Sequence, residues 1–355
     1  MNDTPTGPLA ALTGILKHHY VWGIAAIVVL LAINLAGDPS YLAITVSERG
    51  NLVGNIIDIL RAAAPIMMIA VGMCLVVATK GIDLSVGSVM VVAGAVAMEY
   101  LAAAAPDSVG AALVAVGLVI LVSAALGAVN AILVSVVGLQ PFISTLIIML
   151  AGRGLAKVIT AGQNTSANND AFSWIANGRV FGFPVIFLIA LALVILVGLL
   201  VRRSALGLML EAIGMDAQAA RLAGVNRRAL LFTVYILGGI LAGIAGVFAT
   251  ASVMTVDVSR TGYQLELDAI LAVVIGGTSL AGGKFNITGA TIGAILIATL
   301  DKTVVFLGIS SSATPAFKAI IIVALVLLQS ERVRRAFRRR RILRPAAEKK
   351  EEVAA

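Results

Sequence analysis

The sequence predicts an all-α integral membrane protein with about ten transmembrane helices and both termini in the cytoplasm. Three observations predict this fold class: an apolar composition, a series of apolar segments of membrane-spanning length, and a one-sided distribution of basic residues. Of 355 residues, 60% are hydrophobic and 12% are charged, whereas soluble domains have about 25% charged residues. The mean hydropathy is +1.05. The aromatic content of 5% disfavours an outer-membrane barrel, which needs girdles of aromatic residues.

The apolar segments define the predicted helices, because a helix needs about 20 residues to cross the hydrocarbon core. The eighth segment is short enough to be re-entrant or broken, and the fourth is long enough to be tilted. The first is interpreted as a helix and not as a cleaved signal, because it has no clear small-residue cleavage site. The predicted spans are 20–37, 62–79, 84–104, 109–138, 141–160, 181–201, 229–253, 268–282, 286–307 and 314–330.

The domain boundaries follow from these spans. A cytoplasmic segment, 1–19, precedes the transmembrane domain, 20–330, and a basic, then mixed-charge, cytoplasmic tail, 331–355, follows it. With both termini inside, 18 of the 26 basic residues fall in inner loops and tails, including the eight arginines between Arg332 and Arg344. Basic residues accumulate on the cytoplasmic side of membrane proteins, so this topology agrees with the positive-inside rule. The outer segment 160–180 is expected to be a periplasmic loop.

The distribution of charge and histidine excludes several functions. The net charge of +8 does not indicate nucleic-acid binding, because the arginines lie beside membrane spans, where they fix orientation or contact anionic lipid. No P-loop, H-E-x-x-H or G-x-S-x-G motif occurs, and the two histidines lie near the N-terminus. The single cysteine, Cys74, lies inside an apolar segment. We therefore expect no catalytic residues, no metal site and no cofactor in this chain.

Polar residues inside the predicted spans are the first functional candidates, because such groups are expensive in lipid and mark a pathway or a structural contact. Asp83 and Ser85 either cap the third helix or take part in the pathway. Glu99 and Arg153 either pair with each other or meet lipid headgroups. The pathway suits a neutral, hydroxyl-rich cargo, because most acidic residues lie near the ends of spans. The candidates are Asp83, Ser85, Glu99, Asn130, Gln140, Arg153, Lys157, Glu266 and Asp268; Lys302 and Lys318 also fall within spans.

The central loop 202–228 is the second candidate. It is basic at both ends and has a short amphipathic helical pattern between them, with Ala217 and Ala220 near one face. One interpretation is an ordinary cytoplasmic loop whose charge fixes orientation. The other is a short helix that docks into a separate cytoplasmic protein.

Three blocks of sequence resemble one family. The first is Val71-Gly72-Met73 followed by 81–88, Gly-Ile-Asp-Leu-Ser-Val-Gly-Ser; the second is Glu211-Ala212-Ile213-Gly214 with Ala219-Ala220 and Ala223-Gly224-Val225; the third runs from Glu266 to Gly283. They resemble the signature and the coupling loop of permease subunits of ABC importers of the ribose, xylose, arabinose and galactose group. The resemblance covers about 50–330, and 151–163 with Pro141-Phe142 is most similar to the galactofuranose permeases.

The resemblance implies an assembly in which two permease subunits, identical or related, carry a pentose or hexose delivered by a periplasmic sugar-binding protein. A separate ABC ATP-binding subunit would hydrolyse ATP, and this chain would contact it through Glu211, Ala212, Gly214, Ala219, Ala220 and Gly224. The implied pathway or signature residues are Gly81, Asp83, Ser85, Gly87, Ser88, Asn130, Gln140, Phe142, Arg153, Glu266, Asp268, Gly276 and Gly277. The chain departs from the family pattern at Lys80, where glycine is common, at Asp216, where asparagine is, and at Ala223, where serine is.

Two alternatives remain open on sequence alone. Permeases for branched-chain amino acids or nucleosides belong to the same broad superfamily. An ATP-independent channel or secondary transporter is a different class, and it would work without a partner ATPase.

Overall fold

The computed structural model describes residues 19–47, 50–106, 108–310 and 312–329. Most of the expected N-terminal segment and the whole basic tail therefore lie outside the described residues. Eight of the described helices are long and apolar enough to cross a membrane. They are α2 (His19–Gly37), α3 (Asn55–Ala78), α4 (Val86–Ala103), α5 (Val109–Ser135), α6 (Pro141–Ile159), α8 (Val185–Arg203), α11 (Arg227–Val253) and α13 (Ile287–Phe306).

These helices lie close to the predicted spans, with one clear difference at the start of α3. The predicted span begins at 62, directly after Arg61, whereas the helix begins at Asn55. Partners for the charged side chains explain the difference. Arg61 donates to the carbonyl of Ala176 and to Asn177 Oδ1, and Asp58 pairs with Lys302 at 2.7 Å.

The two remaining predicted spans correspond to shorter helices. Helix α14 (Thr314–Gln329) has 16 residues, and α12 (Leu265–Ile275) has 11. At 1.5 Å per residue α12 is about 16 Å long, roughly half the hydrocarbon thickness. The predicted span 268–282 is therefore a half-helix, which ends where Gly276 and the left-handed Gly277 follow. The chain covers the rest of the distance with the largely non-helical segment 254–264.

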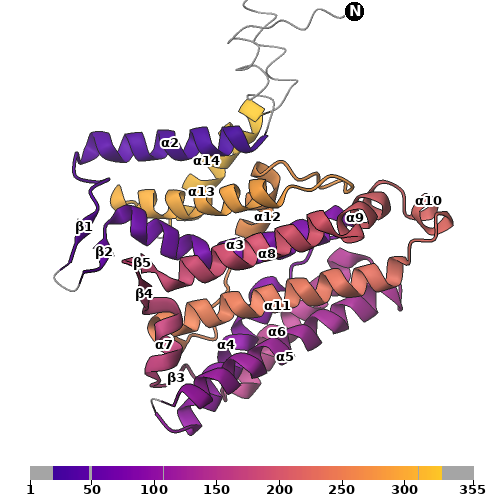
Figure 1. Ribbon diagram of the computed structural model, residues 1–355, viewed down its shortest axis with the longest axis horizontal. Helices are drawn as coiled ribbons and strands as arrows, with labels where there is room; N and C mark the ends of the chain where they lie inside the picture. Colours follow the sequence, from indigo (N-terminus) through magenta and orange to yellow (C-terminus); the bar gives the residue numbers. More distant parts are fainter. Residues whose placement is uncertain (1–18, 48–49, 107, 311, 330–355) are drawn as a thin grey trace, which may run out of the picture.

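The helices form a layered bundle with α2 at one edge and α5 and α6 at the other (Figure 1). Helices α3 and α11 lie between these edges and contain much of the buried core. The small face of α11 packs against α5, with Gly239 and Gly243 directed at Ser123. Small residues let two helix backbones approach closely.

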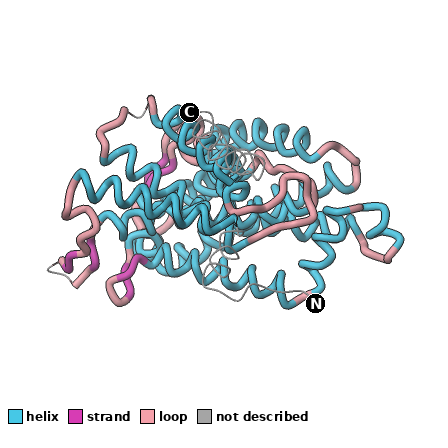
Figure 2. Tube along the Cα trace, turned by 90° about the horizontal axis from the view of Figure 1, so that it is seen from above, coloured by secondary structure: helices cyan, strands magenta, loops and turns pink. Residues whose placement is uncertain are grey.

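The two ends of the bundle differ. At one end, α9 (Ala205–Met215) and α10 (Ala217–Leu222) project together (Figure 1). At the other end lie the short strands, visible in Figure 2. They pair as β1 (Thr45–Val46) with β2 (Leu52–Val53), β3 (Thr165–Ser166) with β6 (Thr255–Val256), and β4 (Arg179–Val180) with β5 (Phe183–Pro184).

The strand-bearing end also contains a helix that the sequence did not predict. The segment 160–180, expected as a loop, includes α7 (Asp170–Asn177). Phe172 and Ala176, four residues apart, bury one face of this helix, and the Asn169 side chain accepts from the Phe172 amide as its N-cap. The basic loop 202–228 lies at the opposite end, which the positive-inside rule assigns to the cytoplasm.

Two non-helical stretches meet inside the bundle. The stretch 79–85 turns back from the end of α3 and leads into α4, and 254–264 leads into α12. Just after the first stretch, Gly87 in the first turn of α4 touches Gly262 of the second stretch, and a Cβ atom on either residue would overlap the carbonyl oxygen of the other. Gly262 also has a φ of 69°, a conformation that glycine adopts readily. The packing of α4 against the segment before α12 therefore depends on this contact.

We expect Gly87→Ala to lower the stability of the folded chain by about 1–3 kcal/mol, because the new methyl group has no free volume. The measurement is thermal denaturation of the purified protein in mild detergent. Gly154→Ala is the matched control, since a Cβ there meets no atom within 4 Å, and alanine favours a helix by about 1 kcal/mol. Equal melting temperatures for Gly87→Ala and the unchanged chain would contradict the close approach.

Candidate functional site

A buried polar network holds the stretch that leads into α4. Asp83 Oδ1 accepts hydrogen bonds from the Ser85 amide at 2.8 Å and from Ser85 Oγ at 2.6 Å. Asn130 of α5 donates from Nδ2 to Ser85 Oγ at 2.8 Å, and Ser144 of α6 donates to Asn130 Oδ1 at 3.5 Å. All four side chains are at most 3% exposed. The predicted residues Asp83 and Ser85, from one segment, are thus brought together with the predicted Asn130 of α5.

Threonine and serine side chains complete the support of this stretch. Thr145 Oγ1 accepts from the Leu84 amide at 3.1 Å and donates to the Ile82 carbonyl at 3.0 Å. Ser88 donates to the Ser85 carbonyl at 2.7 Å and approaches the Ile148 carbonyl at 3.3 Å. The Thr145 contacts satisfy backbone groups that have no helical partner. Between the two interpretations of Asp83 and Ser85, the geometry favours support of the start of α4.

A second cluster lies where Gly87 meets the segment before α12. The Arg153 guanidinium of α6 donates to the carbonyls of Thr261 and Gly262, at 2.9 and 2.8 Å. Glu266, in the first turn of α12, is half-buried and approaches Gly87. Arg153 therefore caps free carbonyls inside the bundle.

Glu99 lies elsewhere and does not pair with Arg153. Its Oε1 accepts from Thr165 Oγ1 at 2.5 Å, beside the short strands. The expected alternative of a Glu99–Arg153 pair is therefore wrong, because each group has found a nearer polar partner.

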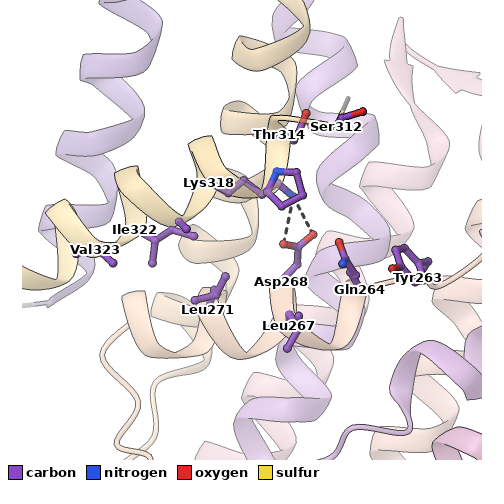
Figure 3. A pocket seen from close by; sticks show the side chains of 12 residues that line it. Tyr263, Gln264, Leu267, Asp268, Leu271, Ser312, Thr314, Lys318, Ile322 and Val323 are labelled. Carbon is purple, nitrogen blue, oxygen red and sulfur yellow. Dashed lines mark hydrogen bonds and ion pairs between the residues drawn. The ribbon is translucent and has the colours of Figure 1, made fainter. Parts of the chain in front are cut away.

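A third cluster joins three helices through charge. Lys318 of α14 lies 3.0 Å from Asp268 of α12 (Figure 3). It lies 2.8 Å from Asp301 of α13. The sequence singled out Asp268 but did not select Lys318 or Asp301 as candidates. The sequence does show that Lys318 and Asp301 are charged residues within apolar spans. It does not show that they pair, because Asp268, Asp301 and Lys318 are far apart in the chain.

The remaining predicted pathway residues lie apart from these clusters. Gln140 precedes α6 and is exposed, and Phe142 in its first turn is 46% exposed. Gly276 packs against the backbone of Gly289 and Ala290, and Asn286 donates to its carbonyl. Gly276 and Gly277 thus end α12 and connect it to α13.

The loop 202–228 folds into the two short helices α9 and α10. Gly214 is buried, and a Cβ there would overlap the carbonyl of Ala78 at the end of α3 and the amide of Gly283. Glu211 and Ala212 are half-buried, and Ala220 is buried, whereas Ala219 and Gly224 are exposed. The loop is therefore seated on α3 and on the connection after α12. Its exposed apolar residues are Leu208, Met215 and Leu222, at 74%, 68% and 85% exposure.

The structure explains two of the three departures from the family pattern. Lys80 has a φ of 65°, a conformation in which glycine carries no steric penalty, and its Nζ donates to the Met215 carbonyl at 3.1 Å. Asp216 is the N-cap of α10, a role that asparagine fills equally well. Hydrogen bonds from the amides of Ala219 and Gln218 hold the pKa of the Asp216 carboxyl below its usual range. Nothing in the structure explains Ala223.

The Asp216 cap acts in its charged form. Its contribution is present above the ordinary carboxyl pKa of about 3.9 and is lost as the pH falls through the lowered value. Helix α10 therefore keeps its cap throughout the neutral range.

Comparison with known proteins places the chain among transport proteins. The family described as "Branched-chain amino acid transport system / permease component" matches residues 55–329. The fructose import permease protein FruF of Bifidobacterium longum is 49% identical over 325 residues, which are 90% of each chain. The galactofuranose transporter permease protein YtfT of Escherichia coli is 41% identical, over 89% of this chain and 92% of its own.

A third relative broadens the group. The ribose import permease protein RbsC of Escherichia coli is 37% identical, over 86% of this chain and 92% of its own. No solved structure gives a significant match. The resemblance to sugar permeases seen in the sequence blocks is confirmed.

We expect Asn130→Ala to lower stability by about 1–3 kcal/mol, because it removes the donor to Ser85 Oγ and the acceptor of the Ser144 hydroxyl inside the bundle. Thermal denaturation in detergent measures the effect. Ser135→Ala is the control on the same helix, since Ser135 bonds only the carbonyl of Ala131 in its own helix, and we expect less than about 1 kcal/mol from it. Equal melting temperatures for the two variants would refute the contribution of this network to stability.

The left-handed backbone at Lys80 gives another prediction. Lys80→Gly should stay within about 1 kcal/mol of the unchanged chain, because relief of the backbone offsets the lost contact with Met215. Lys80→Val should lose about 1–2 kcal/mol, since a β-branched residue resists positive φ. Lys284→Val is the control at a nearby exposed position outside the left-handed region. A Lys80→Val protein as stable as Lys284→Val would disprove this explanation.

Proposed function

Because this chain belongs to the family of branched-chain amino acid transport system permease components, we propose that it is the membrane permease subunit of an ATP-driven importer for a monosaccharide. The chain is a multi-pass protein of the bacterial cytoplasmic membrane. The observation that carries the choice of cargo is the near full-length similarity to permeases named for fructose, galactofuranose and ribose. A pentose or hexose is therefore the proposed cargo, delivered by an extracytoplasmic binding protein.

The energy would come from a separate ATP-binding subunit. Helices α9 and α10 are the proposed contact with it, because they project from the bundle and Leu222 is 85% exposed. Exposed apolar side chains at the end of a membrane protein favour a protein partner. A partner that changes shape with ATP can bias the permease only if it binds its two states differently.

The packing of α9 against the rest of the chain supports a way for the partner to influence the transmembrane helices. Gly214 rests on the end of α3 and on Gly283, and Lys80 bonds the Met215 carbonyl. A displacement of α9 would therefore reach α3 and the connection between α12 and α13. Glu211 and Ala212 are half-buried at this seat, while Ala219 and Gly224 face outward. Of the six proposed coupling residues, the buried and half-buried ones hold the two helices in place, and the exposed ones contact the partner.

The dimeric arrangement is part of the same proposal. A path for a sugar needs polar lining on every side, and the polar candidates of one bundle are divided among separate clusters. We therefore propose that two permease subunits, identical or related, enclose the path.

The test is affinity purification of the tagged chain from membranes in mild detergent, followed by identification of the copurifying proteins. We expect an ATP-binding subunit whose recovery falls about tenfold in Leu222→Asn, since loss of one apolar anchor weakens association by about that factor. The melting temperature of Leu222→Asn should be unchanged, because the side chain is exposed.

Two further variants complete the design. Phe181→Asn is the control at the opposite end, where Phe181 is 97% exposed and asparagine tolerates its φ of 51°. Gly214→Val should lose both the partner and thermal stability, because α9 loses its seat. A chain that purifies alone from cells expressing its partners, and moves sugar into liposomes without ATP, would overturn the proposal.

A further inference from the structure

A cavity of about 730 Å³ lies between the start of α12 and helix α14 (Figure 3). This volume is within the range of small-molecule sites, about 300–1,000 Å³. Leucines 267 and 271 of α12 and Ile322 of α14 form its apolar side. Its polar lining consists of Tyr263, Gln264, Asp268, Ser312, Thr314 and Lys318.

The charges beside this cavity determine which solvent it faces. The side chains of Lys318 and Asp268 are 15% and 13% exposed, and that of Asp301 is 37% exposed. One ammonium group lies between two carboxylates, so the ionised cluster has a net charge of −1. Charged groups within membrane spans face the protein interior or a water-filled cavity, because hydrocarbon solvates them poorly. The open side of this cavity must therefore meet water or polar protein.

Other exposed faces of the bundle differ from this one. The outward side of α5 presents Leu113 and Leu121, at 68% and 66% exposure. Leu267 and Val323 beside the cavity are exposed to a similar degree, 51% and 57%, but they adjoin the charged cluster. Similar exposed fractions thus occur in two different settings, one suited to lipid and one to water.

We infer that this cavity is a solute-contacting section of the permeation path, in which Asp268, Gln264 and Lys318 bind the hydroxyl groups of the sugar. The inference rests on the proposed function and adds a location to it. A carboxylate accepts, an ammonium donates and an amide does both, which matches hydroxyls that donate and accept. The apolar side suits the C–H face of a sugar ring. The net negative charge disfavours anionic solutes.

Lys318 also connects the helices around this site. Its bonds to Asp268 and Asp301 tie α14 to α12 and α13. A sugar hydroxyl that binds Asp268 competes with Lys318 for the same oxygens, and Asp301 then keeps the ammonium paired. The solute thereby loosens α12 from α14 without leaving a buried charge alone.

The first experiment measures water access with cysteine labelling. Cys74 is the only cysteine in the chain and is buried, so Cys74→Ser provides a background for Leu267→Cys, Val323→Cys and the control Leu121→Cys. Intact cells that express the complex are treated with a charged, membrane-impermeant methanethiosulfonate. We expect the two cavity positions to react at least about tenfold faster than position 121, because only a hydrated thiol forms the reactive thiolate. Equal rates at all three positions would overturn the inference.

The second experiment tests solute contact. Asp268→Asn should raise the KM for uptake by about tenfold, the factor expected for loss of one charge-assisted hydrogen bond. Asp58→Asn, which breaks the ion pair with Lys302 away from the cavity, should change the KM less than about twofold. Uptake is followed with labelled D-fructose, D-ribose or D-galactose, whichever the unchanged complex imports, and complex recovery verifies assembly.

The outcomes separate the two proposals. Normal uptake by Asp268→Asn, with an unchanged KM, would overturn the cavity as a sugar site and leave the permease function intact. If the unchanged complex imports none of the sugars, the proposed cargo fails, and the labelling rates still decide whether the cavity is hydrated.

Discussion

The structure depends on one constraint: backbone groups that leave a helix inside the bundle must find partners in the protein, because lipid offers none. Two stretches, 79–85 and 254–264, break helical hydrogen bonding, and Gly87 just after the first touches Gly262 in the second. Side chains replace the missing partners. Thr145 serves the first stretch, and the Arg153 guanidinium serves the second through two carbonyls. Helix α4 and the half-helix α12 start inside the bundle where these side chains are in place.

This arrangement connects the two ends of the molecule. Helix α12 starts beside Arg153 and has Asp268 in its first turn, and the connection after it reaches Gly214 under the α9–α10 pair. A rigid helix of about 16 Å thus separates the proposed solute cavity from the proposed partner contact. Coupling between distant sites requires an element with two arrangements that both sites bias. Within the described residues, α12 and the connection after it join the two regions, and the exchangeable Lys318 contacts are where the position of α12 can change.

The charged residues of the spans divide by role once their partners are known. Arg153 binds backbone carbonyls and Glu99 binds a threonine hydroxyl, so both support the fold. Lys318 binds two carboxylates beside a cavity, an arrangement with surplus negative charge. Intramembrane ionisable groups mark function by default, but a partner made of backbone indicates support. Charged residues that support the fold and charged residues that mark function look alike in the sequence and differ only in what they contact.

The sequence by itself determined the solvent, the approximate spans and the family, since these rest on composition, on apolar length and on local motifs such as 81–88 and 211–224. It also identified Asp83, Ser85, Asn130 and Arg153 as important polar residues. Only the tertiary structure decided that α12 is a half-helix, that Gly214 faces its own chain, and that Lys80 needs a left-handed backbone. It alone joined Lys318 to Asp268 and Asp301. The reason is physical: hydropathy is a property of neighbouring residues, whereas close backbone approach and charge pairing are set between residues far apart in the chain.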